Sequence, residues 1–103
     1  MTDQRLTNEL ACRVMGWRVT PDRFITSGRS WLPKWRFSPL LRLEDALQLL
    51  DHAASDYRLS TVDGHRFTAE VRVGGRRGKA SGKSRPRTIT MAIANAVGLE
   101  FLE

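Results

Sequence analysis

Apolar residues recur at helical spacing in three separate stretches of the chain. The first covers about residues 2–15, with Leu6, Leu10 and Val14 four positions apart and Gly16 as a left-handed stop. The stripe of the second is Leu43, Ala46, Leu47, Leu50 and Ala54. The third is predicted to begin near residues 84–86 and to end at Gly98. Its stripe is Ile89, Ala92, Ile93, Ala96 and Val97.

Between the second and third helices the pattern changes to the alternation of β-strands. Residues 57–62 and 66–73 read as two strands joined by an Asp63-Gly64 turn, which predicts a hairpin. Gly74-Gly75 makes a second turn, and residues 76–81 are expected to add a short third strand. Residues 17–19 read as one more short strand.

Residues 20–39 follow neither period. Gly28, Pro33 and Pro39 interrupt this stretch, whose large apolar residues need burial, so we expect an ordered loop packed on the core. The residues that need burial are Phe24, Trp31, Leu32, Trp35 and Phe37. The chain is therefore predicted to be one α+β domain over residues 1–103, in the order α-β-loop-α-β-β-(β)-α. We expect a small antiparallel sheet of three or four strands flanked by helices.

The composition is strongly basic, with a formal net charge of +6, and most of the cations are arginine. Such a balance favours an anionic partner, although a GC-rich genome that encodes arginine where lysine would also serve would produce the same composition without any function. Cys12 is the only cysteine, which fits a reducing compartment, and we expect it to be a small buried side chain. No apolar run is long enough to span a bilayer and no signal-peptide pattern opens the chain, so we expect a cytoplasmic location.

The densest chemical feature is a basic run over residues 72–87. No acidic residue occurs between positions 71 and 99, and four glycines would let the backbone approach a ligand closely. The run ends at a predicted helix start, where free N–H groups attract anions. The candidate anion-binding residues are Arg72, Arg76, Arg77, Lys79, Lys83, Arg85 and Arg87. The alternative is a solvated basic loop without a ligand.

A second candidate surface alternates aromatic and basic residues over positions 29–37. Trp31, Trp35 and Arg36 are candidates for contact with a partner, because aromatic rings stack on bases and arginine contacts phosphate. Burial in the core is the reading we favour, with the basic side chains extending outward, because a small domain needs the apolar area.

Neither a catalytic nor a metal site is evident in the sequence. His52 and His65 are far apart, the cysteine is single, and no nucleophile has an assigned base. Residues 78–84 resemble a phosphate-binding P-loop, but Arg77 stands where its first glycine belongs. We therefore expect a protein that binds a partner and is not an enzyme, without a cofactor.

Three segments resemble the phage ABA sandwich domain family. Residues 11–17, ending in Val14-Met15-Gly16-Trp17, are similar to its "xVMGW" start. Residues 35–39 followed by Asp45-Ala46 are similar to its "FxPS…DA" segment, and residues 80–89 to its "A-x-x-x-T-x-P-x-A-I" ending. The resemblance implies a small α/β sandwich encoded by a phage or prophage, with no agreed activity. The basic run departs from the acidic or neutral residues expected before the last helix.

Residues 57–97 also resemble, more weakly, a double-stranded-RNA-binding domain. That resemblance implies a hairpin turn with His65 in a minor groove, and phosphate contacts from Lys83, Arg85 and Arg87. Pro86 and Ile89 replace two residues that are basic in that family.

The leading hypothesis is a phage-encoded binding protein that contacts nucleic acid or a nucleoprotein through the basic run. The second is an inhibitor of host defence, similar to anti-CRISPR proteins, that caps an acidic host protein surface. The third is a nucleotide sponge that holds a small phosphate ligand at the glycine-rich segment. The type of nucleic acid and the oligomeric state stay open.

Overall fold

The computed structural model describes residues 2–62 and 66–99, with the side chain of Val62 left out. The elements follow the order α-β-β-β-α-β-β-β-α, with two sheets and three helices in the described part of the chain. The helices are α1 (Asp3–Arg13), α2 (Leu43–Ala53) and α3 (Arg85–Ala96), and a short 3-10 turn, η1, covers Lys34–Arg36. The predicted α+β class is confirmed, but the strands form two sheets where we expected one.

The segment that we expected to be a loop contains most of the additional sheet. β1 (Arg18–Val19), β2 (Arg23–Ser27) and β3 (Ser30–Pro33) pair antiparallel in that order, so the prediction of an ordered loop over residues 20–39 is wrong. Gly28 forms the hairpin tip with φ of 45°. Pro33 is tolerated because it ends an edge strand, where a missing N–H removes little pairing.

The second sheet follows the predicted alternation closely. β4 (Asp56–Val62), β5 (Arg66–Val73) and β6 (Arg76–Gly82) pair antiparallel in sequence order. Leu59, Ala69 and Ala80 stand side by side across the three strands. The predicted Asp63-Gly64 turn lies outside the described residues.

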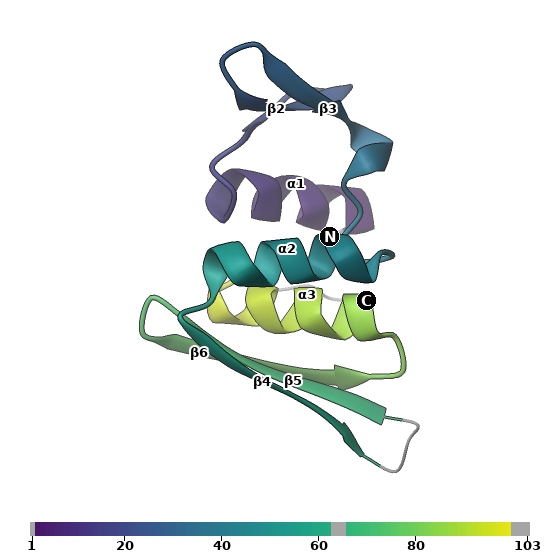
Figure 1. The fold of residues 1–103 in the computed structure, drawn as a ribbon, viewed down its shortest axis with the longest axis vertical. Coiled ribbons are helices and arrows are strands. Elements are labelled where there is room, and N and C mark those ends of the chain that lie inside the picture. Colours follow the sequence, from purple (N-terminus) through teal and green to yellow (C-terminus); the bar gives the residue numbers. More distant parts are fainter. Residues whose placement is uncertain (1, 63–65, 100–103) are drawn as a thin grey trace.

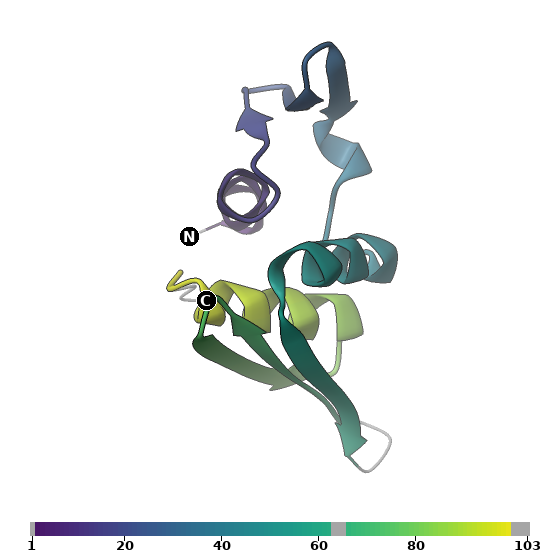
Figure 2. The same cartoon turned by 60° about the vertical axis from the view of Figure 1, so that its left-hand side comes forward.

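The helices lie in the middle of the molecule, between the two sheets (Figures 1 and 2). α3 packs on β5 and β6, and α2 packs on α3. α1 lies between these two helices and the first sheet (Figure 1). The molecule is elongated, with extents of 44 × 26 × 24 Å, and the two sheets occupy the ends of its long axis (Figure 1).

The core is continuous through the helical layer, and its largest side chains are Leu6, Leu10, Phe24, Phe37, Leu49, Leu50, Ile89 and Ile93. Some expectations about burial are wrong. Leu43 and Leu47 of the predicted α2 stripe are 38% and 37% exposed, and Leu49 is buried instead. Both possible stripes on α2 share Ala46 and Leu50, so periodicity alone could not choose between them. Cys12 is exposed, because it lies outside the buried face of α1 that Leu6, Leu10 and Ala11 form.

The inner face of β6 consists of small residues, and this lets α3 lie directly on the strand. A Cβ on Gly78 would overlap the carbonyl oxygen of Ala92, and one on Gly82 would lie 3.1 Å from the Thr88 hydroxyl. Helix α3 therefore fills the space beside Gly78 and Gly82, where the sequence suggested that a ligand could approach. Gly74 and Gly75 adopt φ of 56° and 83° in the turn before β6.

Candidate functional site

The outer face of the second sheet collects basic side chains from all three strands. Since Gly78 and Gly82 face α3, alternation directs Arg77 and Lys79 to the opposite side. Their cross-strand partners on β5 are Arg72 and Glu70, and these stand beside Asp56 and Arg58 of β4. All six side chains line one open depression. We call its four cations, Arg58, Arg72, Arg77 and Lys79, the basic sheet face.

Two of these four cations have acidic partners. Arg72 lies 3.8 Å from the carboxylate of Asp56, and Lys79 lies 3.4 Å from that of Glu70. Both pairs are exposed, so solvent and salt screen them strongly. Arg58 and Arg77 make no ion pair with any residue that the structure describes. The face therefore keeps an excess of positive charge.

The remaining residues of the predicted basic run lie elsewhere. The guanidinium of Arg76 lies beside Gly98, just beyond the carboxyl end of α3, where the helix dipole is negative. Arg85 lies over the ring of Phe67 at 5.8 Å, and Arg87 pairs with Asp3 of α1 at 3.2 Å. Lys83 is exposed beside the start of α3. The run is thus divided among three places. Three of its residues, Arg72, Lys79 and Arg87, pair with acidic residues of other elements.

The start of α3 offers little backbone for anion binding. The hydroxyl of Ser84 accepts a hydrogen bond from the N–H of Arg87, and Pro86 has no N–H. The segment with the P-loop resemblance lies mostly within β6, so it does not form a phosphate cradle. His65 lies outside the described residues.

The aromatic segment is split between the core and the surface. Phe37 is buried, as is Phe24 from β2, whereas Trp31 and Trp35 are 50% and 65% exposed. The favoured expectation of burial is therefore wrong for both tryptophans. Each carries an arginine over its ring: Arg23 lies 4.3 Å from the Trp31 centroid, and Arg36 lies 5.8 Å from that of Trp35. These cation–π contacts stabilise both rings at the surface, where they stay partly exposed.

The first sheet joins the helices through an aromatic cluster. The ring of Trp17 contacts those of Phe24 and Phe37 at centroid distances of 5.9 and 4.9 Å. Lys34 lies over Phe24 at 4.5 Å and donates a hydrogen bond of 2.8 Å to Asn8 of α1. Partial burial lowers the pKa of the Lys34 ammonium, and the charge of Asp22 opposes that shift.

Two of the segments that carry the family resemblance have structural roles. Gly16 ends α1 with φ of 72°, and Trp17 then enters the aromatic cluster. The N–H of Ser38 donates a 2.9 Å hydrogen bond to the carboxylate of Asp45, which fixes the entry to α2. These motifs therefore help to specify the fold.

Other kinds of site find little support in the described residues. Within residues 2–62 and 66–99, no group of three His, Cys, Asp or Glu side chains is placed to hold a metal ion. In the same part of the chain, no helix is long and apolar enough to cross a membrane.

The architecture defines an α+β protein in which three helices separate two small antiparallel sheets. It is similar to the 2.0 Å crystal structure of a phage protein from Bacillus cereus ATCC 14579, with a TM-score of 0.77 and 20% sequence identity. The match covers 99% of this chain and 93% of that protein, so the two share the whole fold. No family model matches the chain. No curated protein matches it in sequence.

Sequence reasoning missed several basic residues that the structure adds to the candidate surfaces. Arg58 belongs to the basic sheet face, and its signal was available in the alternation of the hairpin strands. Arg18 and Arg23 lie on the first sheet, most of which the sequence pattern predicts to be a loop. Only the register of β1 with β2 could have revealed that they share a face.

Proposed function

We propose that this chain is a phage- or prophage-encoded, non-catalytic protein that binds nucleic acid through the basic sheet face. The shared fold with the Bacillus cereus phage protein and the resemblance to the phage ABA sandwich domain family support the viral origin. One observation carries the binding role: four cations from three strands line a single open depression that holds only two carboxylates. Arg58 and Arg77, which lack acidic partners in the described chain, supply the uncompensated charge.

Binding is electrostatic and largely independent of sequence. Guanidinium groups on an exposed sheet contact phosphate oxygens, which position a ligand without reading its bases. Phosphate also displaces the screened carboxylates of Asp56 and Glu70, so that Arg72 and Lys79 become available. Neutralising several phosphates releases counterions, which supplies the free energy of binding.

A fluorescence-anisotropy titration with a labelled duplex of about 20 base pairs tests this proposal. We compare the wild-type chain with the R58Q/R77Q variant and with R5Q/R42Q, which removes the same charge from exposed positions elsewhere. R58Q/R77Q is expected to weaken binding about tenfold or more, since each lost charge-assisted contact costs about 1 kcal/mol or more. Equal affinities of the two variants would overturn the proposal, as would a wild-type chain that does not bind.

A second candidate function has its own observation. Trp31 and Trp35 remain exposed, and exposed aromatic residues with neighbouring arginines are typical of binding hot spots between proteins. This favours an inhibitor that contacts an acidic host protein. Pull-down from nuclease-treated host lysate separates the two functions. A specific host protein that the W35S variant fails to capture supports inhibition.

A further inference from the structure

We propose that the chain bridges two nucleic-acid segments, one at each end of its long axis. This inference rests on the proposed function of the basic sheet face and adds a second binding surface on the first sheet. We call that surface the hairpin surface and define it by Arg18, Arg23, Arg29 and Trp31.

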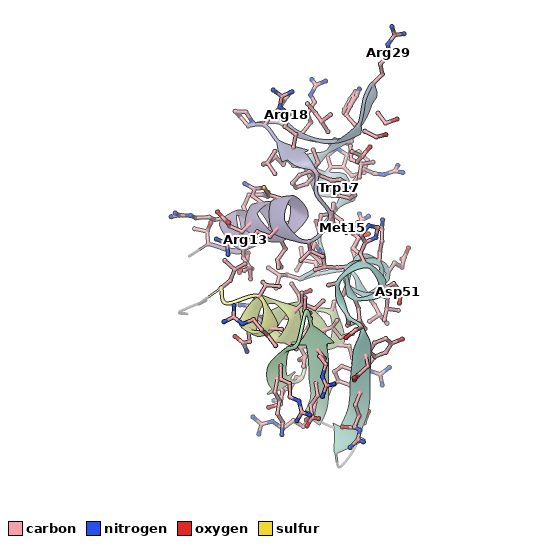
Figure 3. The ribbon with its side chains drawn as sticks, turned by 90° about the vertical axis from the view of Figure 1, so that its left-hand side faces the viewer. Arg13, Met15, Trp17, Arg18, Arg29 and Asp51 are labelled. Carbon is pink, nitrogen blue, oxygen red and sulfur yellow. The ribbon has the colours of Figure 1, made fainter. Side chains whose placement is uncertain are left out.

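Strand register places the hairpin surface on the side of the first sheet that faces away from the helices. Arg18, Ile25 and Trp31 stand in one cross-strand row. The neighbouring row contains Phe24, which is fully buried, so its side chains face the core. Figure 3 shows Arg18 and Arg29 pointing outward from this end of the molecule, and Arg29 marks its extremity.

The chemistry of the hairpin surface suits the same class of ligand. Trp31 is half exposed and carries the Arg23 guanidinium at 4.3 Å, so an aromatic platform and a cation stand together for base stacking and phosphate contact. Residues 17–36 contain five basic residues and one acid, Asp22, which pairs with Arg23 at 2.9 Å. Arg18 and Arg29 form no ion pair with any residue that the structure describes.

The two surfaces act independently because of their separation. They lie at opposite ends of a molecule 44 Å long, whereas salt screens charges beyond about 10 Å. The layer between them does not continue the basic surface, because α1, α2 and α3 together contain five acids and four arginines. In Figure 3, Asp51 lies on α2 in this middle layer. A short stiff duplex that contacts one end therefore leaves the other end free.

A bead assay tests bridging with the full chain. One duplex of about 20 base pairs, far shorter than the persistence length of about 150 base pairs, is immobilised so that it cannot wrap around the protein. A second, fluorescent duplex of the same sequence is added with the wild-type chain, R18Q/R29Q, R58Q/R77Q or R5Q/R42Q. Captured protein and captured fluorescence are measured separately, and circular dichroism melts confirm that each variant folds.

The wild-type chain and R5Q/R42Q are expected to retain the fluorescent duplex. R18Q/R29Q and R58Q/R77Q each retain protein on the beads through their intact end, but at least about fivefold less fluorescence per captured protein. A wild-type chain that is captured without fluorescence overturns bridging and leaves the proposed function standing; a hairpin surface that serves a protein partner gives this result. A wild-type chain that is not captured at all overturns the proposed function as well.

Self-association is distinguished by the same variants. If the chain dimerises and both copies bind through the same surface, the dimer alone can hold two duplexes. A variant that keeps this surface would then bridge as well as the wild-type chain. Fluorescence retention by R18Q/R29Q or R58Q/R77Q equal to that of the wild type therefore overturns the two-ended proposal.

Discussion

Gly78 of β6 lies directly against the backbone of Ala92 in α3, with no space for a side chain between strand and helix. The close approach brings α3 onto the sheet and turns Arg77 and Lys79 to the opposite face. Gly78, which the sequence suggested for ligand contact, therefore lies on the inner face of the sheet and positions the basic side chains on the outer face.

We predict that Gly78→Ala destabilises the fold by about 2–3 kcal/mol, because the added methyl group overpacks the interface between β6 and α3. Chemical denaturation measures the free energy of unfolding. Gly82→Ala is the matched control, since its Cβ would meet only the Thr88 hydroxyl at 3.1 Å and the loss should be smaller. Equal losses for the two variants would show that the close approach at Gly78 has no special cost.

The hydroxyl of Thr90 donates a 2.8 Å hydrogen bond to the carbonyl oxygen of Pro39 in the buried core. Thr90→Val keeps the shape but leaves that carbonyl without this donor, so we expect a loss of about 1–3 kcal/mol. Thr68→Val on the outer face of β5 is the control, and its effect is expected to stay within about 0.5 kcal/mol. Thermal melts that give the same midpoint for Thr90→Val and the wild type would contradict this assignment.

Phe24 and Trp31 occupy adjacent positions in the register of the first sheet but opposite faces of it. Phe24→Ala removes a fully buried ring from the aromatic cluster and is expected to cost about 3–5 kcal/mol. Trp31→Ala removes a half-exposed ring, and we expect a cost below about 1 kcal/mol. Urea denaturation of both variants compares them. A larger loss for Trp31→Ala would mean that the sheet faces the other way.

The Lys34 ammonium should titrate below its ordinary pKa of 10.5, because partial burial disfavours its charged form. The unfolded chain then binds more protons at this group than the folded one, so its contribution to stability rises with pH up to about 10.5. NMR titration of the Lys34 side chain measures the pKa. The Lys34→Met variant should lose this part of the pH dependence, and a pKa at or above 10.5 would refute the burial argument.

Much of the fold was accessible from local pattern. The three helices were predictable from their apolar period, β5 from its alternation, and β4 and β6 from the glycine turns that flank the hairpin. β2 and β3 were missed because each is short and Pro33 falls at a strand end. Periodicity also failed where two readings shared the same residues, as with Leu47 and Leu49 on α2.

The candidate site was harder to predict because its charges are paired by tertiary contacts. The ion pair between Arg87 and Asp3 joins positions 84 residues apart, so an uninterrupted run of cations in the sequence did not remain one cluster in space. Conversely, Arg58 is distant from the run in sequence but shares a sheet face with it. The sequence reveals the excess of positive charge, and the strand register shows which of the charged side chains share a face.

The salt dependence of duplex binding tests the basic sheet face most directly. Affinity of the wild-type chain should fall linearly on logarithmic axes between about 50 and 200 mM salt, with a slope of about −0.9 for each phosphate contact. R58Q/R77Q should reduce the magnitude of that slope by about 2, while R5Q/R42Q leaves it close to the wild-type value. Identical slopes for all three proteins, or binding that does not respond to salt, would contradict phosphate binding by this face.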